Sequence, residues 1–196
     1  MLKFLTFALA VSAAPPATPG WDVLDEMIAE AEASAVAAGA DDSGYVDDAA
    51  SREALVSGPL ALLRQGEIDP ALRLFEQELT QAESSGASAE DIARLLTAFA
   101  LTLDEEGLTD KGLPYFRRVI DATRAAYGTL HPDTAYALTD YGIVVSRSDD
   151  AASYRLAEAA LVEAYEIRRE LMGETAPDTA ASLRYLAARR GHPLLT

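Results

Sequence analysis

The sequence of 196 residues contains no cysteine, only two histidines, and 16 basic residues against 32 acidic ones. Without cysteine there is no disulfide framework, no thiolate metal site and no acceptor for a lipid anchor. The formal net charge of −16 opposes binding to nucleic acid and to anionic membrane surfaces. It favours solubility or a basic partner, although a surplus of carboxylates is often only a solvated surface.

Residues typical of catalytic sites are also scarce. His131 and His192 are the only histidines in the sequence, and each stands directly before a proline at an expected helix boundary. The sequence holds no glycine-rich phosphate loop, no metal-ligand spacing and no nucleophile motif. Because acids are so abundant, pairs of carboxylates are uninformative. We therefore expect no catalytic residue, no bound metal and no cofactor.

The acidic segment Asp41-Asp-Ser-Gly-Tyr-Val-Asp-Asp48 is the one candidate for a calcium loop. An EF-hand needs acidic ligands at alternating positions, a glycine at the sixth position and a bidentate glutamate at the twelfth. This spacing lacks that arrangement, so an acidic linker that provides an N-cap for the next helix is the favoured interpretation.

No apolar run is long enough to cross a bilayer, which takes about 20 residues. The N-terminus has Lys3, an apolar stretch from Phe4 to Val11, and small residues up to Ala14, followed by Pro15. This order is typical of a secretory signal peptide over residues 1–13, so we expect a periplasmic or secreted protein. The alternative is an uncleaved amphipathic or merely apolar start. Cleavage would remove Lys3 and leave a formal charge near −17.

Two stretches of the sequence repeat one another 45 residues apart. Between Arg124–Leu138 and Arg169–Leu183, seven of fifteen positions are identical, including Gly-x-x-x-Pro-Asp-Thr-Ala, where chance would give about one. A second echo has an offset of 41 residues, since Gly66, Asp69, Leu72 and Phe75 recur as Gly107, Asp110, Leu113 and Phe116. The chain is therefore expected to be an array of similar units.

Apolar residues at helical spacing and glycine or proline breaks predict the elements. Residues 14–20 are expected to be a disordered joint, residues 21–48 a helix with an acidic linker, residues 49–191 the repeat domain and 192–196 a tail. Pro132 and Pro177 suit first helical turns, whereas Gly58-Pro59 should disturb the first helix of the domain. The helices of the domain are predicted at 50–65, 68–84, 89–105, 109–127, 132–147, 151–172 and 177–190.

These residues resemble the tetratricopeptide repeat (TPR) family, specifically the longer repeat of about 42 residues found in kinesin light chains. The resemblance covers about residues 52–190 and depends on three features. They are a glycine after the first helix, a small residue in the second helix with Phe or Leu one turn later, and the joint around His131-Pro-Asp-Thr-Ala135. It implies an all-α fold, a right-handed α-solenoid of about three helical hairpins with a C-terminal capping helix.

The packing expected from the residues agrees with this resemblance. Small residues in the second helices should allow close approach to the first helices, and the large residues one turn later should fill the space between them: Ala71, Gly112 and Ala157, then Phe75, Phe116 and Leu161. Replacing Phe116 with Ala should cost about 3 to 5 kcal/mol. The same aromatics could form a ligand box, but their helical spacing favours a core.

In this family the first helices of successive hairpins line a concave groove that holds a protein or peptide. Carried over by position, the resemblance implies a partner-binding groove that consists of Arg94, Thr97, Leu101, Tyr136, Thr139, Asp140, Ile143, Arg147 and Arg184. The arginines could receive carboxylates of a ligand, or they could simply pair with the protein's own acids.

One departure concerns peptide capture. The Asn that many peptide-holding repeats carry in the first helix is replaced by Ser57, Ala98, Asp140 and Arg184. The sequence thus predicts a non-catalytic exported scaffold for protein–protein interaction. A self-associating module of a larger assembly is the alternative, and an enzyme is a weaker one.

Overall fold

The computed structural model describes residues 49–147 and 150–189, and the described part of the chain is all-α with no strand. The expected signal peptide, joint, first helix, acidic linker and tail lie outside the described residues. The described helices are α2 (Ala49–Leu55), α3 (Ser57–Arg64), α4 (Ile68–Ser84), α5 (Ala89–Glu105), α6 (Thr109–Tyr127), α7 (Pro132–Val145), α8 (Ala151–Met172) and α9 (Pro177–Arg189).

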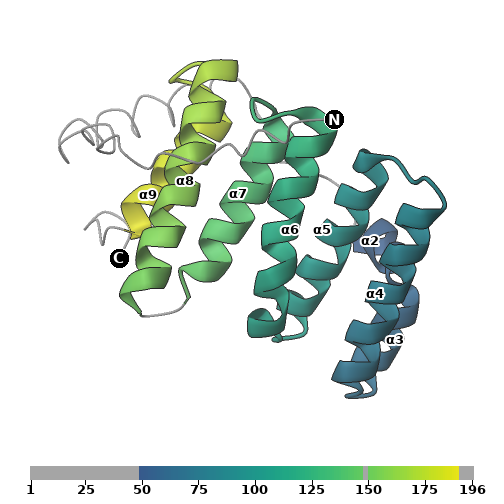
Figure 1. The fold of residues 1–196 in the computed structure, drawn as a ribbon. Helices are drawn as coiled ribbons and strands as arrows, with labels where there is room; N and C mark the ends of the chain where they lie inside the picture. Colours follow the sequence, from purple (N-terminus) through teal and green to yellow (C-terminus); the bar gives the residue numbers. More distant parts are fainter. Residues whose placement is uncertain (1–48, 148–149, 190–196) are drawn as a thin grey trace, which may run out of the picture.

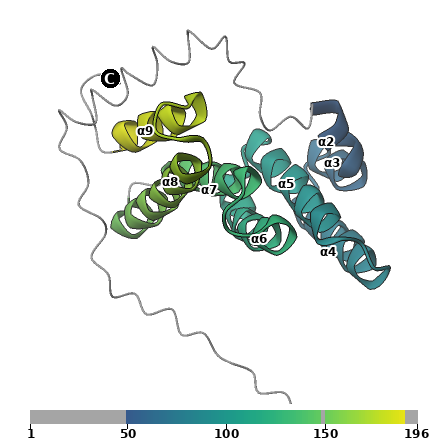
Figure 2. The same ribbon diagram turned by 90° about the horizontal axis from the view of Figure 1, so that it is seen from above.

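The helices form a solenoid of antiparallel pairs, as predicted. α3 packs against α4, α5 against α6 and α7 against α8, while α9 packs on α8 at the C-terminal end of the described array. Figure 1 shows these pairs side by side along the array. Seen from above in Figure 2, α9, α7, α5 and α2 follow the inner side of a curve, and α8, α6 and α4 follow its outer side.

The helix expected over residues 50–65 is two helices in the structure, and this part of the prediction was wrong. The break lies at Val56, which caps α3 and is fully buried. Pro59 then falls in the first turn of α3, where its missing N–H leaves no hydrogen bond unmade. The disturbance expected from Gly58-Pro59 is therefore a break after α2, followed by a new helix, α3, that begins at Ser57. α2 buries none of its residues.

The other helix boundaries follow local signals in the sequence. Ser88 caps α5 and forms a reciprocal capping box with Asp91. Pro132 and Pro177 begin α7 and α9, and α7 ends at Val145, two residues before its predicted end. Gly128 and Gly173 end α6 and α8 with φ near +90°, a conformation that other residues rarely adopt.

The core lies between the helices of each pair and continues from one pair to the next. The residues predicted to pack there are buried: Ala71, Phe75, Gly112, Phe116, Ala157 and Leu161. The structure buries four further residues on the facing helices: Phe99, Leu103, Tyr141 and Val145. They form a core rather than a ligand box. A smaller, separate cluster of Leu161, Tyr165, Leu183 and Leu186 attaches α9 to α8.

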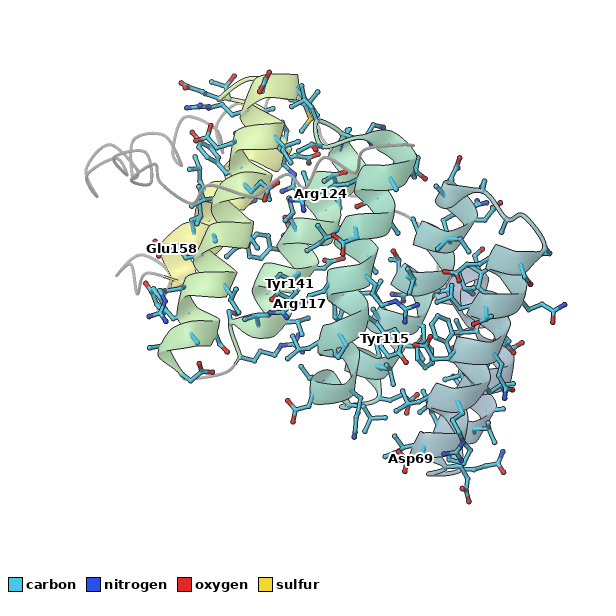
Figure 3. All side chains as sticks on the ribbon, viewed as in Figure 1. Asp69, Tyr115, Arg117, Arg124, Tyr141 and Glu158 are labelled. Carbon is cyan, nitrogen blue, oxygen red and sulfur yellow. The ribbon has the colours of Figure 1, made fainter. Side chains whose placement is uncertain are left out.

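Side chains of α6 connect neighbouring pairs. Arg118 forms an ion pair with Glu76 of α4 at 2.6 Å, and Arg124 forms one with Glu163 of α8 at 2.5 Å. Arg117 donates a hydrogen bond to the hydroxyl of Tyr141, and these two side chains lie together at the α6–α7 boundary in Figure 3. α6 therefore contacts the pair before it and the pair after it.

Candidate partner-binding groove

The inner face holds a pocket of about 270 Å³ between α5, α7, α8 and α9. Figure 2 places three of these helices, α5, α7 and α9, along the inner side of the curve. The pocket is lined by Leu101, Tyr136, Thr139, Asp140, Ile143, Arg168, Asp178, Ala181 and Tyr185. Its walls are partly apolar, while two carboxylates and one guanidinium contribute charge.

One wall of the pocket joins the N-terminal part of α7 to the first turn of α9. The Tyr136 hydroxyl donates a hydrogen bond of 2.9 Å to the Asp178 carboxylate, which lies 42 residues further along the chain. Asp178 is in the first turn of α9, where an acidic side chain complements the helix dipole. The repeated Pro-Asp joint thereby positions a carboxylate at the rim of the pocket.

Arg168 of α8 is the buried cation of the site, with only 4% of its surface exposed. Its Nη1 donates hydrogen bonds to the hydroxyls of Thr139 at 2.8 Å and Ser182 at 2.7 Å. Its guanidinium lies over the ring of Tyr136, 4.7 Å from the centroid. Its Nε is buried without a hydrogen-bond partner. One side chain thus connects α7, α8 and α9, at the cost of an unmade hydrogen bond.

Asp140 has the most perturbed carboxyl group of the pocket. Burial raises its pKa to about 6, against the influence of the nearby cations Arg168 and Arg52 and with a small addition from Asp104. Within the described part of the chain, no hydrogen bond or ion pair engages its carboxylate. Its ionised form is favoured by the charges of Arg168 and Arg52 without a direct bond to either, and it lines an open pocket.

Five of the nine predicted groove residues meet at this pocket: Leu101, Tyr136, Thr139, Asp140 and Ile143. Their spacing along α5 and α7 explains this, because residues three or four positions apart share a helix face. Whether they contact a partner stays a prediction.

The other four predicted residues lie away from the pocket. Thr97 is buried, and its hydroxyl donates to the Ala93 carbonyl, so it is not available on the groove surface. Arg94 forms an ion pair with Asp91 of its own helix, and Arg147 forms one with Asp104 of α5. For these two arginines the pairing with the protein's own acids is observed. Arg184 is exposed on α9.

Sequence reasoning missed four pocket residues: Arg168, Asp178, Ala181 and Tyr185. A signal for Arg168 was present, since the repeat of 45 residues aligns it with Thr123, which is buried in α6. A cation at a core position of a repeat needs partners, and that requirement could have indicated a polar site. Asp178 was recognised only as part of the repeated Pro-Asp-Thr-Ala joint.

Other kinds of site find little support in the described residues. His131 caps α7 by accepting a hydrogen bond from the Asp133 N–H, and its ring stacks on Tyr127, so its role is structural. No group of three or more potential metal ligands occurs in residues 49–147 and 150–189. None of the helices in these ranges has the length and apolarity that a membrane span requires.

No protein-family profile matches the sequence, and no curated protein matches it. Among solved structures, the chain is similar to the crystal structure of BtubC (BKLC) from P. vanneervenii. The TM-score is 0.56 and the sequence identity 18%, over 87% of this chain and 67% of that chain. At this identity the similarity concerns the fold, and it agrees with the helical pairs described above. The chain has a TPR-type helical repeat fold like that of kinesin light chains.

Proposed function

We propose that the protein is a non-catalytic scaffold that binds a segment of another protein in the groove formed by α5, α7 and α9. The observation that carries this proposal is the pocket on the inner face, whose partly apolar lining includes a carboxylate that bonds to no other group in the described part of the chain. Arrays of helical repeats commonly use such concave surfaces for binding. Because the groove residues lie on packed helices, little ordering entropy would be lost on binding.

The arrangement suits recognition better than catalysis. The polar side chains of the pocket are Tyr136, Thr139, Asp140, Arg168, Asp178 and Tyr185, and four of them bond in pairs, Tyr136 to Asp178 and Arg168 to Thr139. A general acid or base needs a partner that holds a reacting group in place, and a nucleophile needs an adjacent base. In the pocket the hydroxyls of Tyr136 and Thr139 are already engaged in hydrogen bonds with Asp178 and Arg168 of the wall.

The binding proposal is tested with an array of synthetic peptides of about 12 residues, probed with the full chain. We expect saturable binding to a subset of peptides. The double substitution Ile143→Ala with Tyr185→Ala should abolish this binding because both side chains line the pocket. The control is Leu156→Ala, since Leu156 is 42% exposed on α8, much like Tyr185 at 43%, and lies outside the pocket. Binding that survives in the double variant, or none in the unchanged chain, would contradict the proposal.

We further propose that the protein is exported. Support comes from the order of charged, apolar and small residues at the N-terminus, which lies outside the described residues. N-terminal sequencing of the protein from its native cells should then begin near Ala14. A chain that begins at Met1 and stays with the cytosolic fraction would contradict export.

Self-association is a second candidate, because α2 buries none of its residues and exposes Leu55 at 43%. In sedimentation experiments at high concentration, such an array would form dimers or longer assemblies. Replacing Leu55 with Lys should then return it to monomers, whereas a chain that is strictly monomeric at all concentrations rules this candidate out.

A further inference from the structure

We propose that the pocket on the inner face holds a lysine or arginine side chain of the bound segment, with the Asp140 carboxylate as its counter-charge. This inference rests on the proposed function and names the chemistry of its ligand. The observation that carries it is the combination of a carboxylate that forms no hydrogen bond or ion pair among the described residues with a buried guanidinium that already bonds to Thr139 and Ser182.

The charges of the pocket favour a cation as ligand. The lining residues include two carboxylates, Asp140 and Asp178, against the single guanidinium of Arg168. Asp178 already accepts the hydrogen bond of Tyr136, so Asp140 is the carboxylate left to receive a ligand. The whole chain, with a formal charge of −16, would attract a basic segment in the same way.

An anion is a poorer ligand for the same site. Arg168 is 4% exposed, its Nη1 donates to Thr139 and Ser182, and its planar group is covered by Tyr136. Its Nε is buried, so a carboxylate that enters the pocket does not reach that atom, and the carboxylates of Asp140 and Asp178 repel an anion. Arg168 therefore acts as a positioning residue that orders the wall of the pocket.

The size and walls of the pocket fit one long basic side chain. Its volume of about 270 Å³ lies just under the range of about 300 to 1,000 Å³ typical of sites for whole small molecules. Leu101 and Ile143 offer apolar surface to the methylene groups of such a side chain. Tyr185, which is 43% exposed, offers an aromatic face to its charged end.

The charge state of Asp140 suits this role near neutral pH. Arg168 of α8 and Arg52 of α2 favour its ionised form, while burial and Asp104 of α5 oppose it. Asp178 and Tyr185 of α9 and Tyr136 of α7 complete the titratable and charged groups that line the pocket. A basic ligand would add the partner that the carboxylate lacks, and it would bind more weakly as Asp140 becomes protonated below pH 6.

The test uses small probes and nuclear magnetic resonance of the full chain at pH 7.5. The probes are the Nα-acetyl amides of lysine and arginine, with norleucine as the neutral analogue and glutamate as the anionic one. The lysine and arginine probes should saturably shift the amide signals of residues 136–143 and 178–185. Norleucine and glutamate should bind at least about tenfold more weakly, as expected for the loss of a charge-assisted hydrogen bond.

Matched variants connect the probes to the carboxylate. Asp140→Asn should weaken binding of the lysine probe about tenfold or more, and lowering the pH from 7.5 to 5 should do the same in the unchanged chain. Asp121→Asn removes the same charge from an exposed position of α6 and should leave binding unchanged. Equal binding of lysine and norleucine, or full binding by the Asp140→Asn variant, would overturn the inference.

The peptide array separates this inference from the proposed function. If the bound peptides share a Lys or Arg, and Asp140→Asn abolishes their binding, both proposals stand. If peptides bind and the Ile143/Tyr185 double variant loses them, but Asp140→Asn does not, the groove function stands and the cation pocket is wrong. If no peptide binds while the lysine probe does, the pocket stands and the scaffold function is wrong.

Discussion

The region where α4 meets α5 and α6 is closed by aromatic rings, whereas the region where α7 and α8 meet α9 is closed around a guanidinium. In the first, Phe75 stacks on Phe99 at 3.9 Å between centroids, and Tyr115 packs edge-on against both. In the second, Arg168 bonds hydroxyls on two neighbouring helices and one of its nitrogens stays unpaired. Similar helical pairs thus form one junction packed with aromatic rings and another that keeps polar side chains beside a pocket.

The two junctions differ in how burial changes the pKa of a titratable side chain, Tyr115 in the first and Asp140 in the second. Burial and the adjacent Glu76 raise the pKa of Tyr115 to about 12, so its hydroxyl stays neutral throughout the physiological range. At the other junction, burial raises the pKa of Asp140 to about 6, so the Asp140 carboxyl group changes its charge close to neutral pH. Charge that is costly to bury is more often kept for binding than for stability.

The largest effect is expected from Phe99→Ala, which removes one of the three rings of the aromatic junction. Phe99 is fully buried, so the free energy of unfolding should fall by about 3 to 5 kcal/mol. Urea unfolding followed by circular dichroism measures this value. Leu156→Ala on the exposed face of α8 is the control and should change it little. A loss below about 1 kcal/mol would mean that the rings do not hold the junction together.

Arg168→Met should have the next largest effect, about 2 to 3 kcal/mol in the same measurement. The substitution removes hydrogen bonds to Thr139 and Ser182, and it removes a cation that interacts with the carboxylates of Asp140 and Asp178. The matched control is Arg169→Met, because Arg169 is the next residue, is exposed and pairs with Glu166. If both variants are equally stable, Arg168 does not hold the polar junction together.

Substitutions of two glycines compare how tightly the hairpins pack. A Cβ on Gly142 of α7 would lie 2.7 Å from Cγ of Leu161, so Gly142→Ala should destabilise the protein by about 1 to 3 kcal/mol. A Cβ on Gly112 of α6 would meet its neighbours at 3.4 Å or more, and Ala is the better helix former. Gly112→Ala should therefore be neutral or slightly stabilising in thermal unfolding. If Gly112→Ala destabilised the protein more than Gly142→Ala, the α7–α8 pair would accommodate an added methyl group more easily than the α5–α6 pair.

The smallest effect is a gain from Asp140→Asn. The native pKa lies above the ordinary value of 3.8, so the folded state binds more protons than the unfolded state between pH 4 and 6. The stability contributed by this group is therefore present at low pH and is lost as the pH rises through 6. The shift sets an upper limit of about 3 kcal/mol, and access of water through the pocket reduces it.

We expect Asp140→Asn to stabilise the protein by about 1 to 2 kcal/mol at pH 8 and by much less at pH 4. Unfolding experiments at both pH values measure the difference, with Asp121→Asn as the control for the change in net charge. A stability loss at pH 8 would show that the Asp140 carboxylate has a structural partner. If the Asp140→Asn variant is more stable at pH 8 and also binds the lysine probe more weakly, then Asp140 lowers the stability of the fold while it contributes to binding.

The helices of the described array could be predicted because their signals are local. The Pro-Asp joints at residues 132 and 177, the glycines before them and the apolar spacing identified helix ends to within about two residues. Small residues such as Ala71 and Ala157 predicted where the helices approach each other. The break at Val56 was harder, because a proline disturbs a helix interior but is tolerated in a first turn, and only the packing of α3 shows which applies.

The groove was predictable only in part. Residues of α5 and α7 that share one face, such as Leu101 and Ile143, were correctly expected together. The positions of the arginines could not be predicted in this way, because an ion pair depends on which acidic side chains of neighbouring helices lie within reach. Arg147, for example, pairs with Asp104 of α5. Ion pairs between residues about 40 positions apart leave no periodic pattern in a chain with this many acids.

The sequence alone determined the repeat, the helices and the small and large residues that let successive helices pack, because each depends on spacing along a helix. The tertiary structure decided how the side chains of α5, α7, α8 and α9 combine. Arg168 reaches both α7 and α9, and Asp140 faces the pocket without bonding to any other residue that the structure describes. Burial and electrostatics depend on every neighbour in space, and such neighbours come from separate repeats whose relative placement follows only from folding.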